Sequence, residues 1–301
     1  MKEMDRQIFW IASYPKSGNT FLRSILTSLF FSEDGLFNFD LLKNIPIIED
    51  TINLNFIKET NTDDYNNIHE LKILSKYWLK MQSKENLDFN GNFLFVKTHH
   101  ALTEAFSNPF TTESCTRGII YIIRDPRDVV VSTSHHFNIS IEESINQIIN
   151  LKTAIPWQDE NNLFLNKKKP FSVLASWKFN YESWAENPFN CPFLLIKYED
   201  LISEKLKTIE KIINFFEENY GFKFHNLNKK TENIITSTHF DALKNNEEKF
   251  GFIESVNKNF FRKGLSNQWE SILSKSEILK IEKNFNSLMK KIGYKTVYFN
   301  E

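Results

Sequence analysis

The sequence predicts an α/β protein in which a parallel β-sheet is flanked by helices. Four short apolar runs are separated by longer segments with helical periodicity, a pattern typical of buried parallel strands covered on both faces. A loop with one glycine follows the first run and precedes a helical pattern. The predicted strands are Ile8–Ala12, Phe93–Val96, Gly118–Ile123 and Phe193–Ile196.

Capping signals support several of the helices expected between and after these strands. Asp125 lies directly before Pro126, which places an N-cap aspartate ahead of a proline at the first helical position. Another helix is predicted to begin at Ser203 and to end near Gly221. The pair Ser274/Glu277 predicts a capping box at the start of a C-terminal helix.

Two stretches, residues 38–67 and 157–170, are irregular and predict long loops. Loops of this length inside a compact domain often serve as lids or binding loops. The second stretch carries a run of three lysines, residues 167–169, for which a solvated turn is the simpler interpretation.

Composition excludes several classes of protein. The chain has 301 residues, of which 41% are hydrophobic, and this suffices for the core of a single domain over residues 1–301. A net charge of −1 argues against a nucleic-acid partner, because such binding rests on clustered positive charge. Cys115 and Cys191 show neither metal-ligand spacing nor a disulfide framework. Without a signal-peptide core or an apolar run of membrane length, we expect a cytoplasmic protein with no membrane span.

The loop Tyr14–Thr20 predicts a phosphate-binding site. A strand–loop–helix turn directs backbone N–H groups and a helix N-terminus at one spot, which attracts a phosphate. The lysine precedes the glycine and no Gly-Lys pair follows, so the loop is not a Walker A motif. An ordinary strand-to-helix turn with a surface lysine is the alternative interpretation. The side chains that would add donors are Lys16, Ser17, Asn19 and Thr20.

Polar residues also follow the other three predicted strands. Ligands of open parallel sheets bind beyond the carboxyl ends of the strands, so we expect these residues to meet the Lys16 loop. Arg124 and Ser132 lie about two helical turns apart and suit a phosphate clamp. Gly264, which follows Arg262 and Lys263, permits close approach of the backbone. The strand-end segments are Lys97–His100, Arg124–Asp128 and Lys197–Asp200.

Together these motifs resemble those of sulfotransferases that use 3′-phosphoadenosine-5′-phosphosulfate (PAPS). Tyr14–Thr20 resembles the family's 5′-phosphosulfate loop, and Lys97-Thr98-His99 matches the strand end that carries its catalytic base. The matches run in the family's order from residue 8 to residue 269. The resemblance implies a P-loop-like nucleotide-binding fold, and we expect a microbial member of the cytosolic type. The other matching segments are Arg124–Ser132 with Phe137, Tyr198–Leu201, Thr238–Phe240, and Phe261–Gly264 followed by Trp269.

The resemblance implies transfer of a sulfuryl group from PAPS, as co-substrate, to a hydroxyl or amine of a small-molecule acceptor, with no metal expected. The implied product is 3′-phosphoadenosine-5′-phosphate (PAP). His99 would remove the acceptor's proton, while Lys97 and Lys16 stabilise charge during an in-line displacement. The implied nucleotide contacts are Lys16, Ser17, Gly18, Asn19 and Thr20 for the 5′-phosphosulfate; Arg124, Ser132, Arg262 and Gly264, with Lys263 beside them, for the 3′-phosphate; and Phe21, Tyr198, Thr238 and Phe240 for the adenine.

Other interpretations of these residues stay open. His100 is an alternative base. Glu199-Asp200 is either a magnesium ligand pair, as in a nucleotide kinase or another P-loop phosphotransferase, or a structural brace for Lys197 or a helix cap. A nucleotide-binding protein without transferase activity is a further alternative. A metal site built from His99-His100 and His135-His136 is disfavoured, because adjacent side chains on a helix do not share a face.

The chain departs from the family pattern at several positions. Phe21 replaces the tryptophan usual in animal members, and residues 265–268 lack the second glycine often present before the tryptophan. The dimer motif of the animal cytosolic group does not follow Trp269, which leaves the oligomeric state open. The acceptor is expected to be apolar or aromatic, near Phe137, His136, residues 38–67 and the loop around Trp157.

Overall fold

The computed structural model describes residues 7–50, 54–89, 91–155, 172–252, 254 and 260–299. The predicted loop 157–170, with Trp157 and the lysine run, lies outside the described residues.

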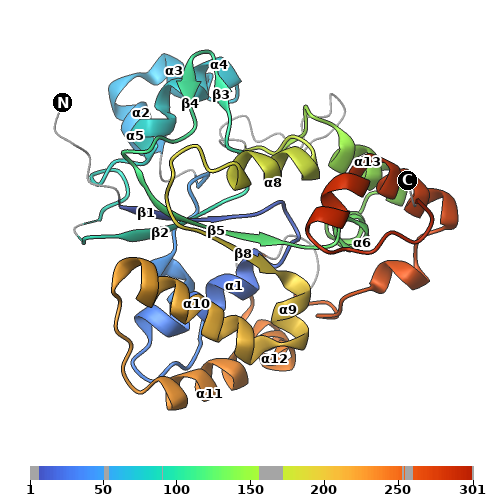
Figure 1. Cartoon of the computed structure of the whole chain (residues 1–301). Coiled ribbons are helices and arrows are strands. Elements are labelled where there is room, and N and C mark those ends of the chain that lie inside the picture. The colour runs from blue at the N-terminus through green and yellow to red at the C-terminus, as the bar shows by residue number, and fades with distance from the viewer. Residues whose placement is uncertain are drawn as a thin grey trace. The chain divides into compact units, whose positions relative to one another are not determined.

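The main sheet has four strands in the order β2-β1-β5-β8 (Figure 1). The central strand β1 is buried along its whole length and runs parallel to both β2 and β5, with Ala12 paired to Thr98 and to Tyr121. The predicted parallel sheet flanked by helices is confirmed, although β2 begins one residue later and ends at Thr98, and β5 begins at Thr116. The strands are β1 (Ile8–Ala12), β2 (Leu94–Thr98), β5 (Thr116–Ile123) and β8 (Phe193–Lys197).

The first of two compact units comprises residues 1–14, 45–121 and 150–193. Its core is aromatic: the ring of Trp10 on β1 lies 5.5 Å from that of Phe110 and 5.8 Å from that of Trp184. Two short antiparallel pairs, β3 with β4 and β6 with β7, complete its strands. The elements are α2 (Asn55–Thr60), α3 (Thr62–Asn66), α4 (Leu71–Leu74), the 3-10 helix η3 (Ser75–Tyr77), α5 (Trp78–Met81), α8 (Trp177–Ala185), β3 (Glu104–Ala105), β4 (Asn108–Pro109), β6 (Ala154–Ile155) and β7 (Ser172–Val173).

The second compact unit comprises residues 15–44, 122–149 and 194–301. Phenylalanine fills part of its core, where the ring of Phe30 on α1 meets Phe216 and Phe222 edge-on at 4.7 and 5.4 Å. The elements are α1 (Asn19–Phe31), the 3-10 helix η1 (Phe39–Asn44), α6 (Pro126–Phe137), α7 (Ile141–Ile149), α9 (Tyr198–Ser203), α10 (Lys205–Tyr220), α11 (Leu227–Ser237), α12 (Phe240–Phe250), the 3-10 helix η4 (Gln268–Ser271) and α13 (Lys275–Lys291).

The local capping signals were mostly correct. Asp125 caps α6 by accepting a hydrogen bond from the backbone N–H of Arg127, and the Ser274/Glu277 capping box is present at the start of α13. The prediction for Ser203 is wrong, because this residue ends α9 and its hydroxyl donates to the carbonyl of Glu199. α10 begins after it at Lys205 and ends at Tyr220, as expected from the glycine that follows.

The stretch 38–67, predicted to be irregular, instead contains η1, α2 and α3. Asn61 begins α3 by accepting a hydrogen bond from the backbone N–H of Asp64 at 3.1 Å. Helices this short take their stability from tertiary packing rather than from propensity, so the local sequence predicts them poorly.

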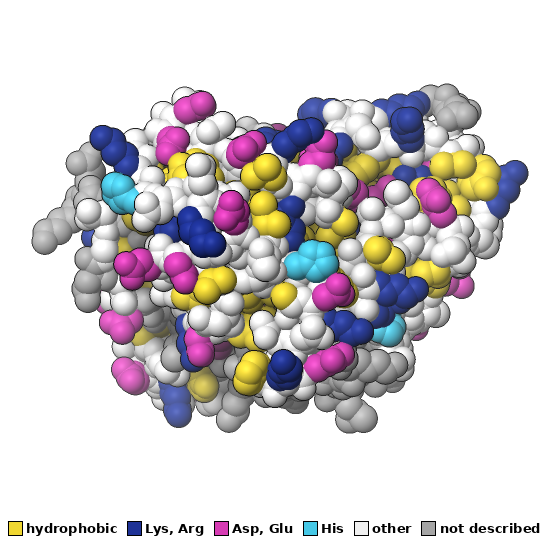
Figure 2. Space-filling view, turned by 90° about the horizontal axis from the view of Figure 1, so that it is seen from below, with side chains coloured by type: hydrophobic (Ala, Val, Ile, Leu, Met, Phe, Trp, Pro, Cys, Tyr) yellow, Lys and Arg dark blue, Asp and Glu magenta, His cyan; other side chains and the backbone are white. Residues whose placement is uncertain are grey.

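No described helix combines the length and the apolar character that a membrane crossing requires. On the face drawn in Figure 2, basic and acidic side chains are intermixed, with hydrophobic side chains between them. This face therefore presents mixed charge rather than one field of a single sign. The expectation of one domain over residues 1–301 stays a prediction.

Candidate functional site

The loop between β1 and α1 has a backbone that depends on glycine. Gly18 has a φ of 96°, and a Cβ at this position would collide with the ring of Tyr198. Lys16 also has a positive φ, 65°, a conformation that costs free energy for an L-residue and occurs often at functional sites. Gly18 and Tyr198, which both belong to the predicted nucleotide contacts, are therefore packed together.

The start of α1 carries polar groups suited to an anion. The N-cap residue of the helix that begins at Asn19 is Gly18, which has no side chain to cap the helix. Ser17 Oγ is buried and finds no hydrogen-bond partner within the described part of the chain. The N–H groups of a helix N-terminus carry partial positive charge, and a buried unpaired hydroxyl costs free energy, so both features favour a bound anion.

The side chain of Lys16 is held over an aromatic ring. Its Nζ lies 4.4 Å from the ring centroid of Phe260. Burial, followed by the charge of Arg124, lowers the pKa of Lys16 to about 8, while the carboxylates of Glu254 and Glu247 act in the opposite direction. Lys16 is therefore a poorly solvated cation at neutral pH, which strengthens its interaction with an anionic group.

Thr20 already has a carboxylate partner. Its hydroxyl donates to Oε2 of Glu254 at 2.9 Å, and Nη1 of Arg23 pairs with Oε1 of the same residue at 2.6 Å. Sequence reasoning missed Glu254, which is separated from Thr20 by 234 positions. A negative group therefore lies beside the predicted phosphosulfate contacts.

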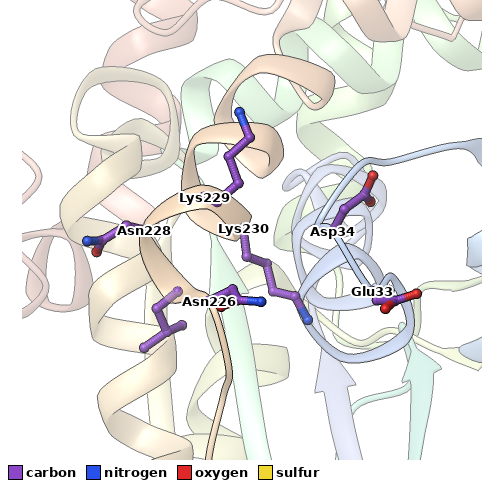
Figure 3. A pocket seen from close by; sticks show the side chains of 7 residues that line it. Glu33, Asp34, Asn226, Asn228, Lys229 and Lys230 are labelled. Carbon is purple, nitrogen blue, oxygen red and sulfur yellow. The ribbon is translucent and has the colours of Figure 1, made fainter.

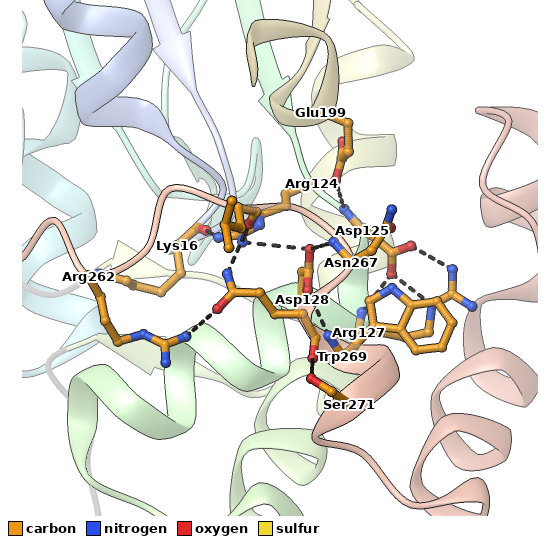
Figure 4. Close-up of polar contacts among 12 residues, drawn as sticks. Lys16, Arg124, Asp125, Arg127, Asp128, Glu199, Arg262, Asn267, Trp269 and Ser271 are labelled. Atoms are coloured by element: carbon orange, nitrogen blue, oxygen red, sulfur yellow. Dashed lines mark hydrogen bonds and ion pairs between the residues drawn. The ribbon is translucent and has the colours of Figure 1, made fainter. Parts of the chain in front are cut away.

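Arg124 links predicted contacts that are far apart in the sequence (Figure 4). Its Nη1 donates to the backbone carbonyl of Lys16 at 3.2 Å, and its Nη2 donates to that of Leu265 at 3.0 Å. Its guanidinium carbon lies 4.2 Å from the ring centroid of Tyr198. We call the matching segment Phe261–Gly264, with the following residues to Trp269, the C-terminal signature. The first loop, the end of β5 and the C-terminal signature thus meet at one guanidinium.

The C-terminal signature is closely packed around its glycine. Gly264 has a φ of 62°, and a Cβ there would overlap the ring of Phe240, another predicted contact. Nη2 of Arg262 donates to the side-chain carbonyl of Gln268 at 2.7 Å, while Lys263 is exposed. Glycine is therefore required at residue 264 by both the backbone conformation and the neighbouring ring.

Phe21 and Thr238 share a neighbour that sequence reasoning missed. Nζ of Lys205 lies 4.9 Å from the ring centroid of Phe21 and donates to the backbone carbonyl of Thr238 at 3.1 Å. The Thr238 hydroxyl is buried and bonded within α11, where it donates to the carbonyl of Ile234. Burial lowers the pKa of Lys205 to about 8. No motif in the sequence marks this lysine.

Ser132 and His136 lie further along α6. Ser132 is half-buried, and among the described residues no hydrogen bond joins it to Arg124. The ring of His136 meets those of Phe137 and Phe260 edge-on at 4.8 and 6.1 Å. Burial, followed by the charge of Lys16, lowers the pKa of His136 to about 4, so this ring is neutral at physiological pH.

In the first unit, His99 follows β2 and is fixed by its neighbours. Its Nδ1 lies 2.8 Å from the backbone carbonyl of Ser13, and a carbonyl oxygen can only accept. The Ser13 hydroxyl oxygen, 3.1 Å from Nδ1, can accept the same proton. Both contacts fit a neutral ring protonated at Nδ1, in which Nε2 is the nitrogen that can take up a proton. Glu49 Oε1 accepts the His99 backbone N–H and Asn180 Nδ2 donates to the His99 carbonyl. Lys97 is half-buried on β2, in the same unit.

His100 belongs to the core of the same unit. It is only 1% exposed, and its ring stacks on Phe110 at 4.1 Å with an angle of 8° between the planes. Burial lowers the pKa of His100 to about 4. These contacts make His100 a packing residue.

Glu199 has a structural role at the start of α6. Its two carboxylate oxygens accept hydrogen bonds from the backbone N–H of Asp125 at 3.0 Å and from the Tyr294 hydroxyl at 2.8 Å. It braces the start of α6 rather than Lys197. Within the described ranges, no group of three or more His, Cys, Asp or Glu side chains is arranged to hold a metal ion.

A cavity also opens beside the end of α1 and the start of α11 (Figure 3). Its charged lining side chains carry both signs, and none of the predicted site residues lines it. The lining residues are Glu33, Asp34, Asn226, Leu227, Asn228, Lys229 and Lys230.

Solved structures of sulfotransferases have the same fold. The chain is similar to mouse sulfotransferase SULT7A1 complexed with PAP, with a TM-score of 0.57, 19% identity, and coverage of 96% of this chain and 85% of that one. It is also similar to retinol dehydratase in complex with androsterone and the inactive cofactor PAP, with a TM-score of 0.57, 18% identity, and coverage of 95% and 82%.

Curated relatives agree with the structural similarity. Sulfotransferase 1B1 of Canis lupus familiaris is 24% identical over 276 residues, which cover 87% of this chain and 76% of the relative. Flavonol 3-sulfotransferase of Flaveria bidentis is 25% identical over 294 residues, covering 91% and 79%. The family model described as the sulfotransferase domain matches residues 6–293. The chain therefore belongs to the sulfotransferase family.

Proposed function

We propose that this protein transfers a sulfuryl group from PAPS to a hydroxyl or amine of a small-molecule acceptor. Family membership supplies the transferred group, and the similar structures bound to PAP suggest the nucleotide. The proposal rests mainly on the contacts of Arg124. Its guanidinium donates hydrogen bonds to both the Lys16 loop and the segment after Gly264. A nucleotide with phosphates at both ends of its ribose needs two basic elements held together in this way.

The residues around Gly18 fit the 5′ end of this nucleotide. The buried Ser17 hydroxyl, which has no partner among the described residues, would gain one in an anionic oxygen. The N-terminus of α1 would add its partial positive charge. Lys16 would place its positive charge against the same group. Asn19 and Thr20 would add their backbone N–H groups, since the Thr20 hydroxyl already donates to Glu254. PAPS, when bound, supplies an activated sulfuryl group attached to a phosphate leaving group.

The remaining contacts are assigned to the 3′-phosphate and the base. Arg124 and Arg262 provide charge for the 3′-phosphate. Gly264 is assigned to the same group through its backbone, because the space of a side chain there is taken by the ring of Phe240. Ser132 and Lys263 supply a hydroxyl and a further charge at the same end. The aromatic and small side chains assigned to the adenine are Phe21, Tyr198, Thr238 and Phe240.

His99 is the proposed general base. Nε2 takes the acceptor's proton as the acceptor's oxygen or nitrogen bonds to sulfur, and the bond from sulfur to the 5′-phosphate oxygen breaks with its electron pair. Lys16 and Lys97 stabilise the charge that builds on the transferred group and the leaving phosphate. The burial of His100 and its stacking on Phe110 favour His99 for this role.

An apolar or aromatic acceptor suits the surroundings of His136. This ring is neutral at physiological pH and lies beside Phe137, which is 41% exposed. Incubating the protein with PAPS and a panel of phenols, alcohols and amines, with detection of sulfated product by mass, tests the proposal. We expect sulfation of phenols or other apolar alcohols. A protein that binds PAP but sulfates no member of the panel would contradict it.

A further inference from the structure

Asp128 lies at the centre of the contacts that fix the C-terminal signature (Figure 4). Its side chain is fully buried in the first turns of α6. Oδ2 accepts the backbone N–H of Asn267 at 2.8 Å, and Oδ1 accepts that of Trp269 at 3.1 Å. The two oxygens therefore clamp one turn of the chain, 139 and 141 positions away.

The same carboxylate is paired with Arg124. The distance from Nη2 of Arg124 to Oδ2 of Asp128 is 3.6 Å. Burial raises the pKa of the Asp128 carboxyl, whereas the charge of Arg124 and the two backbone hydrogen bonds lower it. A buried carboxylate is tolerated only where such partners compensate for its lost hydration.

The clamped turn also sets the position of Arg262. Asn267 has a φ of 59°, so the chain reverses sharply before η4. Gln268, between the two clamped N–H groups, accepts a hydrogen bond from Arg262 at 2.7 Å and donates one to the carbonyl of Leu265 at 2.9 Å. Arg124 donates to that same carbonyl. Asp128 thus holds the residues on either side of Gln268. Gln268 in turn contacts Arg262 and shares the Leu265 carbonyl with Arg124.

We propose that Asp128 is a positioning residue for 3′-phosphate recognition, because it holds the segment carrying Arg262 and Gly264 in a fixed arrangement with Arg124. This inference rests on the proposed function. Asp128 itself would not touch the nucleotide, and its effect would pass through Arg124 and the clamped turn.

Glu282 offers a matched control in the same unit. It is an equally buried carboxylate that accepts backbone N–H groups, those of Val297, Tyr298 and Phe299, and pairs with Arg127 at 2.8 Å. It differs from Asp128 in holding a C-terminal segment that carries no predicted nucleotide contact. Its link to the clamped turn is indirect, because it runs only through Arg127, whose guanidinium carbon lies 3.8 Å from the ring centroid of Trp269. Asp128→Asn and Glu282→Gln should therefore both lower the melting temperature, while only the first affects the nucleotide.

The test compares binding of PAP with binding of adenosine 5′-phosphate, which lacks the 3′-phosphate, by calorimetry on the full chain. Asp128→Asn should weaken PAP binding about tenfold or more and adenosine 5′-phosphate binding less than about threefold, because hydrogen bonds to charged groups have values of this size. Glu282→Gln should keep the wild-type ratio of PAP affinity to adenosine 5′-phosphate affinity. If Asp128→Asn does not fold, Gln268→Ala should reduce the same ratio.

If Asp128→Asn keeps the wild-type ratio of PAP affinity to adenosine 5′-phosphate affinity, the inference is overturned. The same holds for Gln268→Ala where that variant replaces it. In either case PAPS remains the proposed donor. A wild-type protein that binds both nucleotides equally overturns the proposed function, and the role of Asp128 with it.

Discussion

The guanidinium of Arg124 donates a hydrogen bond to the backbone carbonyl of Lys16, 3.2 Å away and 108 positions earlier in the chain. One basic side chain thus helps to hold the loop that carries another. Since Nη2 of Arg124 donates a hydrogen bond to the carbonyl of Leu265, the same residue also fixes the C-terminal signature. The two ends of the proposed nucleotide site are therefore coupled through protein contacts alone.

Replacing Arg124 by Ala should weaken binding of PAP at least about tenfold more than binding of adenosine 5′-phosphate, because a charge-assisted contact is lost. Calorimetric titration with both nucleotides measures this. Arg117→Ala serves as the control, since Arg117 lies in the other unit, where it donates to the carbonyl of Asn92. Equal losses for the two nucleotides would be inconsistent with a 3′-phosphate contact.

Replacing Gly18 by Ala should reduce both stability and nucleotide affinity. The positive φ alone costs about 1–2 kcal/mol, and the added Cβ forces Tyr198 to move. Gly221→Ala is the matched control, because Gly221 also has a positive φ but no atom within 4 Å of the added Cβ. Both variants should have a lower melting temperature than the wild type, and only Gly18→Ala should bind PAP more weakly. Normal PAP binding by Gly18→Ala would argue against close contact between this loop and the nucleotide.

Nucleotide affinity should fall as the pH rises through about 8, where Lys16 loses its charge in the free protein. Bound phosphate favours the protonated amine, so the affinity decreases by up to about tenfold per pH unit above this value. Lys16→Arg should flatten the profile, because a guanidinium stays charged in this range. If the affinity of Lys16→Arg still falls through the same pH range, the fall is due to Lys205 instead, whose pKa is also about 8.

Replacing Glu254 by Gln should tighten PAP binding by about two- to tenfold, because a carboxylate near Lys16 and Thr20 repels an anion. The exposed Glu248, which pairs only loosely with Lys244 at 3.9 Å, provides the control variant Glu248→Gln. Weaker binding by Glu254→Gln would mean that this carboxylate supports the loop more than it opposes the ligand.

Features set by neighbouring residues could be predicted from the sequence. The strands follow from continuous apolar runs such as Ile8–Ala12, and the caps at Asp125 and Ser274 follow from hydrogen bonds within the first helical turn. Ser203 shows the limit of such signals, since a serine can end one helix as readily as begin the next. The short helices in residues 38–67 depend on packing that the pattern does not reveal.

Contacts between distant segments could not be predicted in this way. Family motifs identified Lys16, Arg124 and Gly264, and the structure gathers these residues in one unit. The roles of two nearby carboxylates were missed: Asp128 accepts the N–H of Asn267, and Glu254 accepts from Thr20. Both roles depend on chain segments more than a hundred positions away. Carboxylates are common on surfaces, and only the fold shows that Asp128 is buried and bonded.

The most direct test of the account is sulfuryl transfer by His99→Ala, measured as sulfated product from PAPS with an acceptor that the wild type uses. We expect the turnover rate to fall about 100-fold or more, the usual contribution of a general base, with PAP affinity nearly unchanged. His225→Ala, at an exposed histidine, should behave like the wild type. Full transfer by His99→Ala would contradict the proposed mechanism.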